Sequence, residues 1–225
     1  NFEKLNSYLL VHTLTRYGKN LDEETFRKLK KIENEVSGIT GSEPDEKLAL
    51  DTVSKALTIS VSKVYSQKYV GPEVREDVTN IIKECIGAYR TMLSSEDWLS
   101  EETIKKAVEK LDNITVNAAY PDKWQDTKGL QFTPRKDGGS YFTACIELNK
   151  CNRELDKKKV NTNIYTEAWA NDMALTTANA YYNPLDNSIN IIAGILGGAF
   201  YRPDMTYEEK LAGIGSVIGH EISHA

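Results

Sequence analysis

The chain has 225 residues, enough for one large or two small domains, with 40% hydrophobic and 27% charged content typical of a globular protein. Its formal net charge of −5 argues against nucleic acid as a partner, and no run of about 18 apolar residues offers a membrane segment. Cys85, Cys145 and Cys151 are too few and too irregularly spaced for a disulfide framework or a zinc knuckle, so we expect buried free thiols.

Helical periodicity dominates the first 113 residues. Apolar residues recurring at three- and four-residue intervals predict helices, in chain order, over 2–17, 22–36, 45–70, 74–93 and 100–111. Their apolar stripes are expected to form core. His12 lies in the first of them and is expected to be a structural histidine rather than a metal ligand.

The pattern changes after Asn113. We expect an extended segment over 114–120 and a loop over 127–139. One more amphipathic helix, with a basic end, is expected over 140–158, and a connector that holds Trp169 over 162–170. Residues 1–150 are therefore expected to form a helical domain, and 151–225 the beginning of a mixed α/β portion.

A β-hairpin is predicted next. Residues 176–182 read as one strand, Asn183 to Asn187 carry turn-forming residues, and 188–192 read as the returning strand. We expect the first strand to be a sheet edge, to which an extended peptide could add as a further strand.

The sequence His220-Glu221-Ile222-Ser223-His224 has the form H-E-x-x-H. On a helix, positions four apart share a face, so two imidazoles would point at one tetrahedral zinc ion. Glu221 could then act on a water without binding the metal. The alternative is a helix end that carries two solvated histidines and a glutamate.

Three glycines precede the motif, at Gly213, Gly215 and Gly219. Each costs a helix about 1 kcal/mol relative to alanine. We therefore expect the backbone to approach a neighbour closely on one face of this helix; the alternative is a loop before a short helix.

Several further segments resemble the neprilysin family of zinc endopeptidases, which includes endothelin-converting enzymes and bacterial oligopeptidases. They are Asn179-Ala180-Tyr181-Tyr182, Ala193-Gly194-Ile195-Leu196, the 213–225 run with its H-E-x-x-H, and, upstream, Asp97-Trp98-Leu99-Ser100 and Tyr120-Pro121-Asp122. The resemblance implies a mainly α fold with a small β component (α+β), in which a helical domain precedes the start of a thermolysin-like zincin domain.

The resemblance also implies roles for individual residues. His220 and His224 would bind one Zn²⁺, Glu221 would be the general base that deprotonates the zinc-bound water, and Asn179 and Ala180 would hold the backbone of a peptide substrate. The third zinc ligand, a glutamate, is expected beyond Ala225.

On this basis we expect an internal piece of a larger enzyme, inactive without the remaining C-terminal part. We expect a cytoplasmic bacterial protein; the alternative is a secreted or cell-surface one. Two other functions stay open: a binding module with an incomplete metal site, and a different H-E-x-x-H hydrolase whose third ligand is Glu167 or Glu208.

Overall fold

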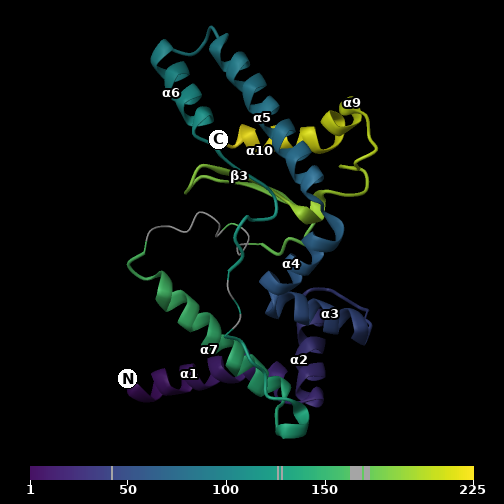
Figure 1. Ribbon diagram of the computed structural model, residues 1–225. Helices are drawn as coiled ribbons and strands as arrows, with labels where there is room; N and C mark the ends of the chain where they lie inside the picture. Colours follow the sequence, from purple (N-terminus) through teal and green to yellow (C-terminus); the bar gives the residue numbers. More distant parts are fainter. Residues whose placement is uncertain (42, 126, 128, 163–168, 170–172) are drawn as a thin grey trace. The chain divides into compact units, whose positions relative to one another are not determined.

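The computed structural model describes residues 1–41, 43–125, 127, 129–162, 169 and 173–225 (Figure 1). The chain forms two compact units, each of two segments. Unit 1 is Asn1–Leu50 with Asp126–Ile164, and unit 2 is Asp51–Gln125 with Tyr165–Ala225. The expected mainly α fold with a small β component is confirmed. Within the described residues, no helix is both long enough and apolar enough to cross a membrane.

Unit 1 is helical. Its elements are α1 (Phe2–Tyr17), η1 (Gly18–Asn20), α2 (Glu23–Val36), the start of α3 (Asp45–Ala56), η2 (Arg135–Asp137) and α7 (Tyr141–Lys159). Asp22 caps α2 by accepting from Thr25 N at 2.8 Å, and Ser140 caps α7 in a capping box with Thr143. These caps explain why both helices begin within a residue or two of their predicted positions.

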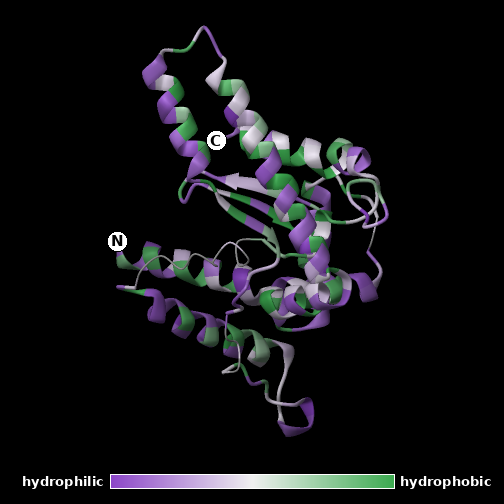
Figure 2. Ribbon diagram, turned by 45° about the horizontal axis from the view of Figure 1, so that its top comes forward, coloured by the Kyte–Doolittle hydropathy of each residue, from purple (hydrophilic) through white to green (hydrophobic). Residues whose placement is uncertain are grey.

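The prediction that the apolar stripe of α1 forms part of a core is wrong. No residue of α1 is buried, and the apolar side chains expected to form core are 52% to 82% exposed. Figure 2 shows hydrophobic residues along this helix, which starts at the label N. His12 is exposed as well, with its ring 4.3 Å from that of Tyr8. Periodicity identified the helix, but burial needs a covering surface, and no described element of unit 1 covers this one.

The predicted helix over 45–70 is two helices, α3 and α4 (Thr58–Tyr69). The break falls at Leu57, whose φ of −117° and ψ of 41° are not helical. Next to it, the Thr58 hydroxyl donates to the carbonyls of Ser54 and Lys55, a local bond that competes with helix geometry. The stripe is also partly misplaced, since Val64 is 65% exposed while Ser62 and Ser66 are buried.

Unit 2 contains the sheet and the core. Its elements are the end of α3, α4, α5 (Pro72–Ser94), α6 (Glu101–Asp112), β1 (Thr115–Ala119), β2 (Ala180–Asn183), β3 (Ser188–Ile192), η3 (Ala193–Ile195), α9 (Tyr207–Lys210), the π-helical turn η4 (Leu211–Gly215) and α10 (Ser216–Ser223). α5 packs against β1, and α10 packs against β2, β3 and α5 (Figure 1).

The sheet has the order β1-β3-β2. β1 runs parallel to β3, and β2 runs antiparallel to it. The predicted hairpin and its edge strand are confirmed, although β2 starts at Ala180 and not at residue 176. The central strand β3 is buried along its whole length. Its polar residue Asn190 is satisfied there because its carboxamide accepts from Asn117 Nδ2 and donates to Ser188 Oγ, both at 2.9 Å.

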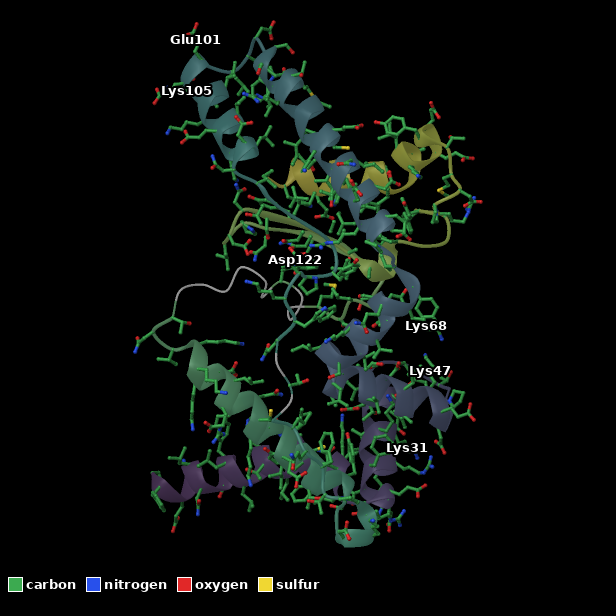
Figure 3. The ribbon with its side chains drawn as sticks, in the orientation of Figure 1. Lys31, Lys47, Lys68, Glu101, Lys105 and Asp122 are labelled. Atoms are coloured by element: carbon green, nitrogen blue, oxygen red, sulfur yellow. The ribbon has the colours of Figure 1, made fainter. Side chains whose placement is uncertain are left out.

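The segment after β1 is tied to α5. Asp122, labelled in Figure 3, forms an ion pair of 2.5 Å with Arg75, whose Nε also donates to the carbonyl of Ala118 at 3.3 Å. The expected domain boundary at residue 150 stays a prediction. The boundaries of the two compact units differ from residue 150, because α5, α6 and β1 share one core with the hairpin and α10.

The three cysteines are free and partly buried. The connector expected over 162–170 lies almost entirely outside the described residues; Trp169 within it is described and buried.

Close backbone approach is confirmed at one of the three glycines. A Cβ on Gly213 would lie 2.3 Å from the carbonyl oxygen of Phe200, which is too near for any side chain. A Cβ on Gly215 would meet Leu211 at 3.3 Å, and one on Gly219 would make an ordinary contact of 4.0 Å with the Tyr89 hydroxyl. Gly213 therefore sets how closely η4 can approach the chain before it.

Gly213→Ala is expected to lower the free energy of unfolding by about 1–3 kcal/mol, since overpacking against a backbone carbonyl forces a shift. Gly219→Ala is the matched control. It is expected to be neutral or to stabilise by up to about 1 kcal/mol, because it only removes a helix glycine. Urea unfolding of the full-length protein measures both; equal effects at the two positions would contradict the role of Gly213.

Candidate functional site

The two histidines of the H-E-x-x-H motif lie together on α10. His220 and His224, the latter at the C-cap, both point to solvent with their Nε2 atoms 3.2 Å apart. Their ring centroids are 4.8 Å apart with the planes at 86°. The helix thus brings two nitrogen ligands to one spot, as the four-residue spacing predicts.

This pair suits a tetrahedral metal. Zinc binds imidazole nitrogen at about 2.0–2.1 Å, so two nitrogens on one tetrahedral ion lie about 3.3–3.4 Å apart. The observed 3.2 Å needs almost no change to reach that value. The residues present therefore fit two ligand positions of a zinc site.

A third ligand is not found among the described residues. No group of three or more histidine, cysteine, aspartate or glutamate side chains gathers in this part of the chain to hold a metal. Glu208, on α9, is described and does not join the histidines. Glu167 lies outside the described residues.

Whereas the two histidines face solvent, Glu221 is buried on the side of α10 that faces the edge of the sheet. Its side chain is 7% exposed, and its Oε2 accepts a hydrogen bond of 3.0 Å from the backbone N–H of Tyr182. Tyr182 is on β2, one of the two edge strands of the described sheet. The carboxylate thus accepts a hydrogen bond from an N–H of the edge strand that points away from β3, and Glu221 directly follows His220 in the sequence.

The two predicted substrate-binding residues lie where β2 begins. Asn179 is exposed just before the strand, and Ala180 is its first residue. The carboxamide of Asn179 accepts from Ala180 N at 2.9 Å and donates to the sulfur of Met173 at 3.6 Å. Ala180 on β2 and Asn179 just before it therefore lie two and three positions before Tyr182, the residue of β2 that contacts Glu221.

Pattern reasoning missed the contacts that hold α10 from the side of α5. The Tyr89 hydroxyl donates to the carbonyl of Gly219 at 2.8 Å, directly before His220. A helical tyrosine in an apolar stripe looks like any core residue, so no sequence signal marks this bond.

A second contact holds the segment in front of η4. Asp77 of α5 accepts at Oδ2 from the Tyr201 hydroxyl at 2.6 Å and from the Lys210 ammonium at 2.8 Å. Burial raises the pKa of Asp77, but the hydrogen bonds from Lys210 and Tyr201 outweigh it and hold the pKa below its ordinary value. Burial and the neighbouring Asp77 raise the pKa of Tyr201.

Comparison with known proteins places this geometry in a family. The chain matches the models "Peptidase_M13_N" over residues 1–121 and "Peptidase_M13" over residues 179–225, both described as peptidase family M13. It is 31% identical over 190 residues to a neutral endopeptidase of Lactococcus lactis, covering 84% of this chain and 30% of that protein. It is 28% identical over 172 residues to neprilysin-2 of Drosophila melanogaster, covering 75% of this chain and 22% of that protein.

Solved structures agree. PepO from Lactobacillus rhamnosis superposes with a TM-score of 0.87 at 27% identity, over all of this chain and 35% of that one. The zinc metalloprotease Zmp1 of Mycobacterium tuberculosis, in complex with an inhibitor, gives 0.85 at 26% identity, over all of this chain and 33% of that one. The chain thus spans about a third of the length of these relatives.

Asp77→Asn is expected to lower the melting temperature at pH 7 and to matter less in acid. Because the folded pKa lies below the ordinary value of 3.8, the stabilisation is present above that pH and is lost as the pH falls through the folded pKa. Melting of the full-length protein and the variant at pH 7 and pH 3 measures this.

Asp204→Asn is the control for that measurement, since Asp204 pairs with Arg202 at 3.2 Å on the exposed surface. A difference between Asp77→Asn and the parent protein that stays constant or grows towards pH 3 would contradict the assignment.

Proposed function

The chain belongs to peptidase family M13, and from this premise we propose that it carries the zinc-binding and general-base residues of a zinc-dependent endopeptidase that hydrolyses small peptides. The observation that supports this most is the pair of imidazole nitrogens 3.2 Å apart beside a buried glutamate. His220 and His224 would hold one Zn²⁺, and a third ligand would come from outside the described residues.

When bound, zinc lowers the pKa of a water to about 7 and polarises the carbonyl of the peptide bond. Glu221 is the general base in this proposal: it takes the proton of the attacking water and passes it to the leaving amine. Its Oε2 is held by the Tyr182 amide, so we assign the proton to Oε1. Zinc chemistry needs Glu221 free of the metal, and its place on the strand side of α10 satisfies this.

The edge strand β2 would bind the substrate in an extended conformation. Ala180 begins this strand, Asn179 directly precedes it, and Glu221 contacts the strand at Tyr182, two residues after Ala180. A peptide added to this edge would therefore pass the general base. Asn179 and Ala180 remain the proposed substrate-binding residues.

The two alternatives have different support. The absence of a third ligand among the described residues favours a module with an incomplete metal site, if no further segment contributes one. A separate H-E-x-x-H hydrolase with Glu208 as ligand has no support, because this exposed residue of α9 does not gather with the histidines.

Metal removal tests the function itself. The full-length protein is expected to cleave an internally quenched peptide, to lose this activity with 1,10-phenanthroline, and to regain it with Zn²⁺. His220→Ala and His224→Ala are each expected to lower bound zinc from one ion per chain to well below one, measured by elemental analysis. Full activity after metal removal, or full zinc content in both variants, would refute the proposal.

Glu221→Gln is expected to keep zinc but lower kcat about 10²- to 10⁴-fold, the usual contribution of a general acid–base group. Gln retains a carbonyl oxygen for the Tyr182 amide, so the change removes the base with little change in shape. Glu208→Gln is the matched control and is expected to have normal zinc content and kcat. Loss of zinc in Glu221→Gln, or a comparable loss of activity in Glu208→Gln, would contradict the assigned roles.

A further inference from the structure

Asn187, at the end of the hairpin turn, joins three elements. Its carbonyl accepts from Thr115 N at 2.9 Å, its Nδ2 donates to the carbonyl of Lys110 at 3.0 Å, and its Oδ1 accepts from the Tyr182 hydroxyl at 2.7 Å. The end of α6, the start of β1 and the edge strand β2 are thus bonded to one residue.

The backbone of Asn187 is left-handed, with φ of +51°. Few residues other than glycine adopt this conformation, and asparagine is among those that tolerate it best. A glycine at this position would satisfy only the backbone requirement, because it has no side chain to form hydrogen bonds. Asparagine meets it and adds a carboxamide, and that carboxamide makes two of the three bonds.

Tyr182 is held at both of its ends. At one end its phenol donates to Asn187, and the Lys110 ammonium lies 5.6 Å from the centre of its ring. At the other end its backbone N–H donates to Glu221 Oε2 at 3.0 Å. An edge strand is paired on one side only, so its backbone has more freedom than that of a central strand. The bonded phenol reduces this freedom at the residue that holds Glu221.

We propose that Asn187 and Tyr182 are positioning residues for Glu221: the Asn187 carboxamide fixes the Tyr182 phenol, and this fixes the backbone amide that orients the carboxylate. The inference rests on the proposed function, in which Glu221 is the general base. Asn187 does not contact Glu221; it acts through Tyr182. A catalytic carboxylate has to be held within about 0.5 Å of its productive place, which one hydrogen bond from a loosely held strand would not secure.

Two variants and their combination test the proposal in the full-length protein. Tyr182→Phe removes the hydroxyl alone, and Asn187→Gly removes the carboxamide while keeping the left-handed backbone. Each is expected to lower kcat about tenfold, the effect of roughly one hydrogen bond, with KM within about twofold and one zinc per chain. The double variant is expected to match the single variants, because both remove the same link.

The control is Asn183→Ala in the same hairpin. Asn183 accepts from Leu185 N within the turn at 3.1 Å, so this variant weakens the turn without touching the link to Tyr182. It is expected to keep kcat within about twofold. The proposal is overturned by a normal kcat in Asn187→Gly, by losses that multiply in the double variant, by zinc loss that parallels the loss of activity, or by an equal loss in Asn183→Ala.

A second readout does not depend on activity. In the metal-free full-length protein, hydrogen exchange at the Tyr182 amide is expected to be faster in Tyr182→Phe and Asn187→Gly than in the parent or in Asn183→Ala. Unchanged exchange in both variants overturns the positioning role. If the parent protein cleaves no peptide, the proposed function fails, while the exchange rates still decide whether Asn187 controls this amide.

Discussion

The buried carboxylate of Glu221 needs a hydrogen-bond donor, and a paired sheet leaves backbone donors only along an outer edge. Tyr182 on β2 provides one at 3.0 Å. α10 therefore has to lie alongside this edge, and the neighbouring positions of the same helix then carry His220 and His224 to the solvent side. The position of the histidine pair relative to the strand thus follows from one hydrogen bond and the helical repeat.

α10 is held from its other side by segments far away in sequence. Gly213 lets η4 approach the carbonyl of Phe200, Tyr89 bonds to Gly219, and Asp77 binds the lysine in front of η4. α5, which supplies Tyr89 and Asp77, lies in the part matched by the M13 N-terminal model, and α10 lies in the part matched by the M13 model. Both parts therefore contribute to the one core that supports α10.

Local pattern was enough to predict the features that depend on near neighbours in sequence. The four-residue spacing of the histidines, the helix starts near Asp22 and Ser140, and the hairpin all depend on local geometry. Which residues are buried was harder to predict, because burial depends on packing partners that periodicity does not identify. The apolar stripe of α1 is exposed, and on α4 Ser62 and Ser66 are buried while Val64 is exposed. The link from Asn187 to Tyr182 could not be predicted for the same reason, since its bond to Lys110 spans 77 residues.

The parallel pairing of β1 with β3 has a consequence for folding order. The side chains of Asn117 on β1 and Asn190 on β3 are hydrogen-bonded although 73 positions separate them in the sequence. The sequence between the two strands includes a segment of unit 1 that contains α7. At about 5–20 residues per second, a ribosome needs roughly 4–15 s to make that stretch. β1 is therefore synthesised seconds before its partner β3, whereas β2 and β3 are synthesised almost together. The pairing of β3 with β1 is therefore a high-contact-order step, the kind of contact that is expected to form slowly, and α10, which packs against β2 and β3, follows both strands in the sequence.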